Sequence, residues 1–274
     1  MKGGLVERIV LFLVSFLACS FGSAVGVGGG IIIKPVLDAL SIFPAETISF
    51  LSGATVCAMS GFSLFCMRKE ENCAKTKTTI FLAAGAVLGG IVGKRIMDLA
   101  LCWFSSWGPG NSDNMLGLTQ SCLQLAVNTA VFLYMRKKSQ IQSVNIKSLM
   151  VSLGLGLGMG LISSFLGIGG GAYNVAVLYY FFSMNSREAG RNSLYIIFCS
   201  QLASAAGFIF CKNIPEFPPA VLGLLIAGAL SGGYLGSKAA GRLSHKKLEQ
   251  VFSGFMVLII LLNLYNMIHF SFSV

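Results

Sequence analysis

The sequence predicts an all-α fold: a polytopic membrane protein with about eight transmembrane helices, two glycine-broken half-helices and an internal two-fold repeat. Three observations lead to this prediction. Only 11% of the 274 residues are charged, whereas 55% are hydrophobic. Apolar runs recur along the whole chain, and a glycine cluster in the first half returns in the second. Soluble domains carry about 25% charged residues, so these few charges cannot cover a soluble protein of this size.

Eight runs without a charged residue mark the expected spans. A bilayer crossing needs roughly 20 apolar residues, and one such run could also be a buried helix of a soluble protein, but eight could not. The first run is long and leads into a glycine cluster instead of a cleavage site, so it is a span and not a signal peptide. The runs are Ile9–Ile33, Thr47–Met67, Thr78–Gly93, Asn114–Met135, Ser148–Ser186, Asn192–Cys211, Phe217–Ser237 and Gln250–Ile268.

The net charge of +10 comes from basic residues near the ends of these runs. Lipid head groups and the positive-inside bias explain such flanks, so membrane lipid and not nucleic acid is the expected partner. Eight simple spans with the N-terminus inside leave only slightly more Lys and Arg on the inner side. The cluster from Lys238 to Lys247 counts against that orientation, and the sequence leaves the orientation open.

The chain repeats itself at a nearly constant spacing. The cluster Gly26–Gly30 returns as Gly167–Gly171, and the segment Gly85–Gly93 returns as Gly228–Gly236. The separation in sequence between Gly26 and Gly167 is here called the repeat offset. We expect a first membrane repeat at residues 1–138, a polar linker at 139–147 and a second membrane repeat at 148–274. Glycine-interrupted spans in corresponding positions are typical of transporters. The orientation of the repeats, parallel or inverted, stays open.

Each glycine cluster is expected to break a helix inside the membrane. As one α-helix, the run Ser148–Ser186 would be roughly 58 Å long, whereas the hydrocarbon core is about 30 Å thick. A full span, a break and a half-helix fit this length. Close helix packing is the alternative role of membrane glycines. It accounts for Gly154, Gly156, Gly158 and Gly160, but less well for a GxGGG cluster.

The two breaks predict a site for a small anion. Non-helical backbone in a membrane must line a cavity or be buried in protein, and the N-terminus of the following half-helix attracts anions. Polar residues near the breaks are further candidates, although interhelical hydrogen bonding is the alternative for each of them. The candidate substrate-binding residues are Gly28, Gly29, Gly30, Lys34, Ser49, Gln120, Gln124, Gly169, Gly170, Gly171, Asn174, Arg191, Asn192 and Ser193.

Three acidic residues near the breaks are candidates for coupling transport to a proton or a sodium ion: Asp38, Glu46 and Glu188. Ionisable groups inside a membrane are functional candidates, although each of these could lie at an interface. Eight cysteines form no CxxC pair, and the two histidines, His245 and His269, lie near or beyond span ends. No catalytic residue, metal site or cofactor is therefore expected, and the chain is not expected to be an enzyme.

The paired glycine motifs resemble the sulfite exporter TauE/SafE family of bacterial membrane proteins. Gly26-Val27-Gly28-Gly29-Gly30 with Pro35 and Leu37, and Gly167-Ile168-Gly169-Gly170-Gly171, carry the resemblance. The segment Arg187–Leu194 is similar to the family stretch Ala-x-Gly-Thr-Ser-Leu. The chain departs from the family pattern where it lacks a proline after the second cluster and has Arg191-Asn192 in place of Gly-Thr.

The resemblance implies a secondary transporter of the bacterial inner membrane that moves a small sulfur-containing anion, such as sulfite, sulfoacetate or another sulfonate. An anion held between helix N-termini agrees with this implication. A passive anion channel and a non-transport accessory protein are the alternatives. Neither the residues nor the resemblance fixes the anion, the direction of transport, the coupling ion or the oligomeric state.

Overall fold

The computed structural model describes residues 5–40, 42–67, 77–106, 112–210 and 215–272, and all its regular elements are helices. They are α1 (Leu5–Val25), α2 (Gly30–Leu40), α3 (Ala45–Cys66), α4 (Lys77–Ser105), α5 (Ser112–Lys137), the 3-10 helix η2 (Lys138–Gln140), α6 (Leu149–Leu166), α7 (Ala172–Phe182), α8 (Ser186–Phe210), α9 (Pro219–Arg242) and α10 (His245–Ser271). The predicted all-α membrane fold is confirmed.

Seven helices in the described part of the chain are long and apolar enough to cross a membrane: α1, α3, α4, α5, α6, α9 and α10. The eighth long helix, α8, has 25 residues and carries Arg187, Glu188, Arg191 and Gln201. Many large apolar side chains point outward from the spanning helices, among them Leu17, Ile91 and Leu261 at 47–57% exposure. Lipid would cover these side chains.

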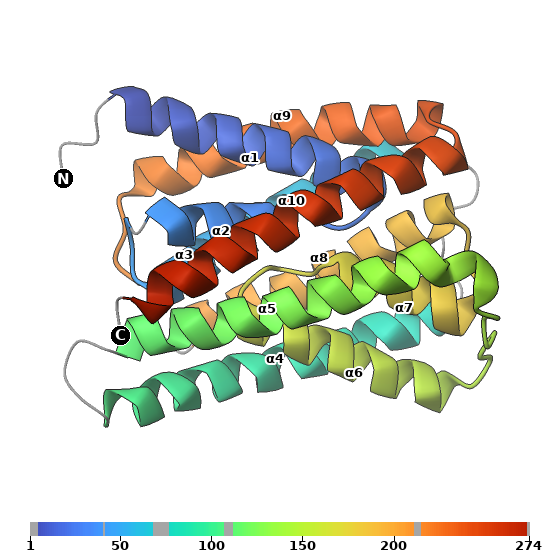
Figure 1. Ribbon diagram of the computed structural model, residues 1–274, viewed down its shortest axis with the longest axis horizontal. Helices are drawn as coiled ribbons and strands as arrows, with labels where there is room; N and C mark the ends of the chain where they lie inside the picture. Colours follow the sequence, from blue (N-terminus) through green and yellow to red (C-terminus); the bar gives the residue numbers. More distant parts are fainter. Residues whose placement is uncertain (1–4, 41, 68–76, 107–111, 211–214, 273–274) are drawn as a thin grey trace.

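Each half of the chain has the same order of elements: a long helix, a break, an 11-residue helix and three long helices. In Figure 1 both termini lie at one end of the molecule, here called the termini end, and the connection between α5 and α6 lies at the other, the linker end. Helix α1 runs towards the linker end, and α2 turns back from the middle towards the termini end. Helix α6 runs in the opposite direction to α1, and α7 returns to the linker end, so the corresponding helices are inverted.

The first helix of each half packs against the fourth helix of the other half. Helix α1 lies against α9, and α6 lies against α4. At both contacts a glycine lets backbones touch: a side-chain carbon on Gly89 would overlap the Leu157 carbonyl, and one on Gly232 would overlap the Phe16 carbonyl. Phe16 and Leu157 are themselves separated by the repeat offset. These matched contacts support the division at residues 1–138 and 148–274, which stays a prediction.

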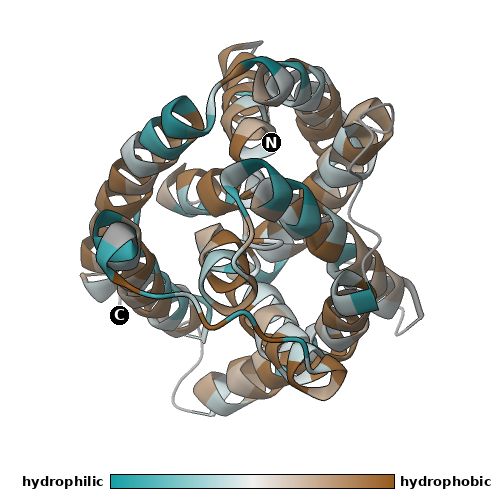
Figure 2. Ribbon diagram, turned by 90° about the vertical axis from the view of Figure 1, so that its right-hand side faces the viewer, coloured by the Kyte–Doolittle hydropathy of each residue, from teal (hydrophilic) through white to brown (hydrophobic). Residues whose placement is uncertain are grey.

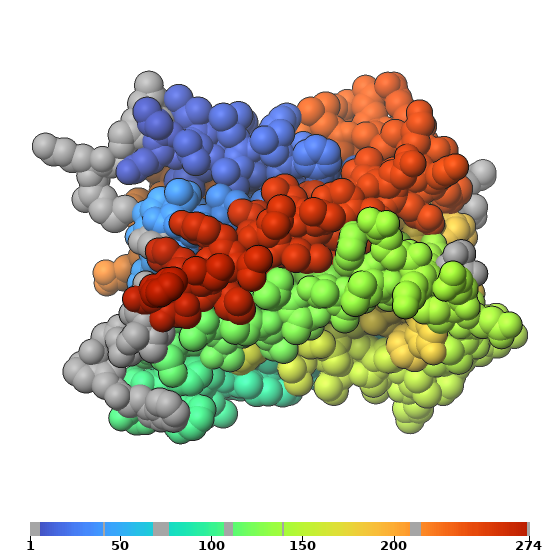
Figure 3. All heavy atoms as spheres, in the orientation of Figure 1, coloured from blue at the N-terminus to red at the C-terminus, as the bar shows by residue number. Residues whose placement is uncertain are grey.

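Helices α5 and α10 lie side by side across the face shown in Figure 3. Helix α10 packs against the half-helix α2, and α5 packs against α7. In Figure 2, which looks along the helices from the linker end, the hydrophilic colour gathers on several of the helix ends nearest the viewer. The two half-helices are therefore surrounded by long apolar helices.

The linker end is the basic end of the molecule. Helices α3, α5 and α9 end there, and α4, α6, α8 and α10 begin there. The positive-inside bias therefore predicts that this end faces the cytoplasm. The sequence could not decide this because α2 and α7 turn back, which changes the count of crossings. The described basic residues of this end are Lys77, Arg136, Lys137, Lys138, Lys147, Arg187, Arg191, Lys238, Arg242, Lys246 and Lys247.

This orientation predicts that the C-terminal end of α10 lies outside the cytoplasm. Alkaline phosphatase folds only where its disulfides can form, so a fusion after residue 274 should be enzymatically active in cells. The same reporter inserted into the linker at residues 139–147 should be inactive. The reverse pattern would assign the linker end to the outside.

Helix packing predicts different roles for neighbouring glycines of α6. A side-chain carbon on Gly160 would overlap the Ala86 carbonyl of α4, whereas one on Gly158 would meet open space. Gly160→Ala should therefore push α4 and α6 apart and destabilise the protein by about 1–3 kcal/mol. Gly158→Ala is the matched control and should leave the midpoint of thermal unfolding in detergent unchanged or raise it. Equal midpoints for the two variants would contradict this packing.

Candidate functional site

Both glycine clusters break their helices, as the sequence predicts. Helix α1 ends at Val25, and Gly26 and Gly28 have φ angles of +79° and +83°. Helix α6 ends at Leu166, and Gly167, Gly169 and Gly170 have φ angles of +63°, +71° and +119°. Residues with a Cβ atom rarely adopt such angles. The two non-helical segments Gly26–Gly29 and Gly167–Gly171 are here called the first and second glycine loops.

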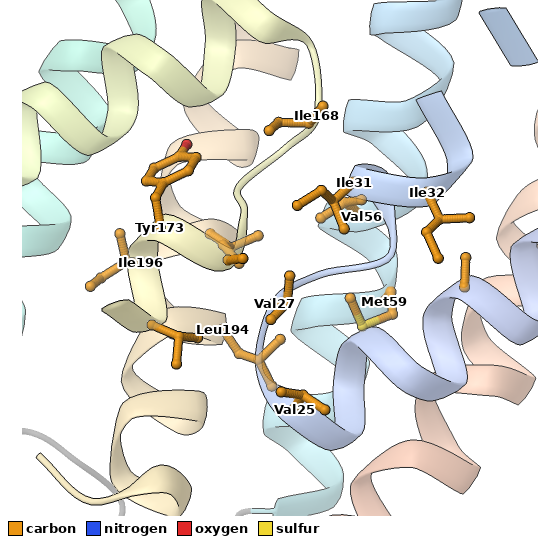
Figure 4. Close-up of a cluster of buried hydrophobic side chains, with 14 of the residues drawn as sticks. Val25, Val27, Ile31, Ile32, Val56, Met59, Ile168, Tyr173, Leu194 and Ile196 are labelled. Carbon is orange, nitrogen blue, oxygen red and sulfur yellow. The ribbon is translucent and has the colours of Figure 1, made fainter. Parts of the chain in front are cut away.

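The two glycine loops meet in the middle of the protein. A side-chain carbon on Gly30 would overlap the Ile168 carbonyl oxygen. In Figure 4, Ile168 of the second loop lies near Ile31 and Val56, and Val27 of the first loop lies between Met59 and Leu194. Val27 and Ile168 are at most 1% exposed. The loops are therefore buried in protein, which is the condition for irregular backbone inside a membrane.

Matched contacts surround the two loops. Gly26 lies directly against the Gly190 backbone, and Gly167 lies directly against Ser49. Ser49 and Gly190 are separated by the same repeat offset as Gly26 and Gly167. The hydroxyl of Ser49 donates to the Ala45 carbonyl, at an oxygen–oxygen distance of 2.8 Å. The structure thus brings Ser49 to the second loop, and the chain segment at Gly190 to the first.

The half-helices α2 and α7 start directly after the loops. The N–H groups of Ile32 and Ile33 donate to the Gly29 carbonyl, and the N–H of Asn174 donates to the Gly171 carbonyl. The side chain of Asn174 is 2% exposed, and its Oδ1 has no hydrogen-bond partner among the described residues. Gly28–Gly30, Gly169–Gly171 and Asn174 are therefore together in one central region.

Lys34 takes a position that the sequence did not indicate. Its Nζ lies 2.7 Å from Oδ2 of Asp38, one turn further along α2, and neither side chain is more than 3% exposed. A substrate-binding candidate and a coupling candidate therefore form one buried ion pair. The other two coupling candidates have different partners. Glu46 pairs with Lys94, and Glu188 accepts from the backbone N–H of Asn185, capping α8.

Gln120 and Gln124 of α5 contact the second break through its carbonyl groups. Their Nε2 atoms donate to the carbonyl oxygens of Phe165 and Leu166, over 2.7 and 3.3 Å. The last carbonyls of a helix lack partners inside that helix, so these two amides satisfy the end of α6. Both side chains are at most 2% exposed. The interhelical role that the sequence offered as an alternative is present here.

The three candidate residues 191–193 of α8 point to different parts of the protein and do not form one group. Asn192 accepts from the Thr79 hydroxyl over 2.7 Å and donates to the Glu188 carbonyl, so it ties α8 to α4. The hydroxyl of Ser193 is buried and has no hydrogen-bond partner among the described residues. Arg191 lines a cavity at the linker end.

Two cavities flank the central loops. One is lined by Ser49, Lys94, Gly167, Gln201 and other residues of α3, α4, α6 and α8. It lies where α3 begins, on the side of the termini end. The other is lined by Gly26, Arg187, Gly190, Arg191, Ser237 and other residues of α1, α8, α9 and α10. It lies where α8 begins, on the side of the linker end.

Serine pairs in these cavities were not predicted from the sequence. The hydroxyls of Ser23 and Ser63 lie 2.9 Å apart, and so do those of Ser164 and Ser204. Ser23 and Ser164 line the linker-end and termini-end cavities, respectively. The two pairs correspond at the repeat offset, so a search for polar residues repeated at that offset would have found them.

Comparison with known proteins adds one result. The family model described as "Sulfite exporter TauE/SafE" matches residues 11–263. Neither a curated protein nor a solved structure is significantly similar to the chain. The match includes both glycine loops and both cavities.

The first loop predicts a specific effect at Gly28. A side-chain carbon there would have ordinary contacts of 3.4 and 3.5 Å with Ile197 and Val56, but φ is +83°. Gly28→Ala should therefore strain only the backbone and cost about 1–2 kcal/mol. Gly28→Asn should cost less, because Asn tolerates positive φ. Thermal unfolding in detergent measures both, and an equally stable Gly28→Ala variant would contradict the turn.

Proposed function

The chain belongs to the sulfite exporter TauE/SafE family, and from that premise we propose that it exports a small sulfur-containing anion by alternating access around the two glycine loops. Members of the family are integral membrane transporters, and the seven apolar helices fit a protein of the bacterial inner membrane. The proposed substrates are sulfite, sulfoacetate and other sulfonates. The observation that carries the proposal is the pair of glycine loops between two cavities at opposite ends.

The arrangement of loops and cavities supports a carrier over a channel. Each cavity is lined by a close contact between a loop and a helix: Gly167 lies against the Ser49 side chain in one, and Gly26 lies against the Gly190 backbone in the other. A carrier opens one such contact at a time, whereas a channel opens both together. The corresponding helices of the two halves are inverted. The same rocking motion therefore opens the cavity at one end when it occurs in the first half, and the cavity at the other end when it occurs in the second, as in other transporters with inverted repeats.

The electrostatics of the two cavities support export. The linker-end cavity is lined by two cationic residues, Arg187 and Arg191. In the termini-end cavity the ammonium group of Lys94 is bound by Glu46 and Asp98, at 3.2 and 2.9 Å. A cleft lined by one sign of charge concentrates the opposite ion. With the linker end in the cytoplasm, anions are attracted from the cytoplasm and are released on the other side.

The central region offers groups that suit an oxyanion. The α2 and α7 half-helices direct their N-termini at the loops, and each N-terminus carries partial positive charge. The Ser193 hydroxyl is a buried donor in α8, the helix that touches both loops through Gly190 and Ile197. Because glycine has no side chain, an anion can approach the backbone N–H groups of the loops. The proposed contacts are therefore Gly28–Gly30 and Gly169–Gly171.

Proteoliposomes containing the purified protein test this proposal directly. Labelled sulfite or sulfoacetate should leave the vesicles, and unlabelled substrate on the opposite side should accelerate the exchange. That acceleration is the sign of a carrier, since a channel gives flow without it. If no sulfur-containing anion moves, the proposed substrate class is wrong.

The charge of the linker-end cavity predicts the effect of Arg191→Gln. Loss of one cation at the proposed entrance should raise the KM for sulfite roughly three- to tenfold, the factor given by about 1 kcal/mol of lost attraction. The effect should shrink at high salt. Lys147→Gln is the matched control, because Lys147 is exposed in the linker and outside the cavity. An equal change in KM for both variants would argue against a cavity-specific role.

A further inference from the structure

The buried ion pair of α2, Lys34 with Asp38, has no part in the transport mechanism proposed above. Lys34 is completely buried and Asp38 is 3% exposed. Among the described residues this is the one salt bridge in which both side chains are buried; in the other three, each side chain is 13–41% exposed. The pair lies on the half-helix that begins at the first glycine loop.

The second half of the chain shows that the fold does not require this pair. At the repeat offset, Lys34 and Asp38 correspond to Val175 and Tyr179. These two belong to α7, which has the same length of 11 residues, the same place after a glycine loop and a matching long helix packed against it. A half-helix of this kind therefore forms with two uncharged residues. Since burying two charges is costly unless something compensates, the pair in α2 calls for a functional explanation.

The surroundings of the pair are mostly uncharged. Helix α2 packs against α1, α3 and α10. The titratable residues of α1 are Glu7 and Arg8 in its exposed first turn and the buried Cys19. Helix α3 contributes Glu46, which is bound to Lys94, and the thiols of Cys57 and Cys66. From α10, Asn266 donates to the Pro35 carbonyl over 2.8 Å, with Tyr265 and His269 close to it in sequence. The charged residues of α10 lie in its first turns, at the linker end.

Charge balance restricts what can happen at such a site. An unpaired charge buried in protein is strongly unfavourable, so an anion can approach Lys34 only if Asp38 loses its own negative charge. We propose that Lys34 and Asp38 form a joint binding site for one proton and one substrate anion. Asp38 takes a proton from water on the open side, and the Lys34 ammonium group then binds the anion in place of the carboxylate.

The same balance governs release. When the anion leaves Lys34 on the other side, Asp38 gives its proton to water there and the ion pair forms again. One proton and one anion therefore move together in the same direction, and the site is electrically neutral in both states for a monoanion. This inference rests on the proposed function and adds the coupling ion to it; for export, the outward gradient of the anion itself must drive the proton out of the cell.

Binding of methanesulfonate to the purified full-length protein at several pH values tests the inference. This anion keeps one negative charge throughout, so any pH dependence belongs to the protein. In the wild type the affinity should rise on acidification, by at most about tenfold per pH unit, the slope for one linked proton. Asp38→Asn should bind at least as tightly as the acidified wild type and without pH dependence. Lys34→Met should bind weakly at every pH.

Two controls separate these effects from misfolding and from general loss of charge. The double variant Lys34→Val with Asp38→Tyr carries the residues of the second half, so it should remain folded in detergent but should not bind the anion. Glu188→Gln removes a carboxylate that caps a helix, and it should keep the wild-type pH slope. A wild-type slope in Asp38→Asn would overturn the inference.

Infrared spectroscopy of the carboxyl groups gives a readout that needs no substrate. Acidification of the wild type should produce a protonated-carboxyl band that is missing in Asp38→Asn. If neither methanesulfonate nor sulfite binds the wild type but this band appears, the proposed substrate class fails and the proton site stands. If the band is identical in both proteins, Asp38 does not take up the proton, and the inference fails whatever the substrate.

Discussion

The fold depends on one constraint: the backbone of the two glycine loops must be buried without water to satisfy it. Each loop leaves peptide groups without helical partners in the middle of a membrane protein, where unpaired polar groups are costly. The structure meets this constraint by packing the loops against each other, with the start of α2 touching the Ile168 carbonyl. Gln120 and Gln124 bind the last carbonyls of α6. The central position of the loops then decides where a substrate can bind and where cavities can form.

The interlocking of the two halves follows from the same constraint. A half-helix flanked only by its own three long helices would leave its loop exposed to lipid. Helix α8 lies against Gly26 of the first loop and α3 against Gly167 of the second, so each half supplies part of the wall around the loop of the other. Helix α1 also packs against α9, and α6 against α4. Glycines such as Gly89 and Gly232 bring these helices into backbone contact. Once the halves share their walls, differences between matched positions, such as Lys34 against Val175, separate what the fold needs from what the activity needs.

The sequence could predict what glycine and apolar runs determine locally: the helical class, the two breaks and the half-helices. It could not predict partners that depend on three-dimensional packing. Lys34 and Asp38 stand four residues apart on a predicted half-helix, so their pairing is a local feature, but their burial follows from the packing around α2. Asn192 was close to a motif in sequence, yet its amide contacts Thr79 of α4. The orientation also needed the structure, because an 11-residue helix that turns back is indistinguishable in sequence from one that continues across.

The pairing of α1 with α9 has a consequence for synthesis of the protein. Helix α1 ends at Val25, and α9 begins at Pro219, so most of the chain is made between the two partners. At about 5–20 residues per second, the ribosome needs roughly 10–40 s to cover that distance. During this time the serines of α1, such as Ser15 and Ser23, lack the α9 carbonyls of Leu225 and Gly233 to which they donate in the finished protein. The insertion machinery must therefore accept an apolar first helix with unpaired serines until α9 is made.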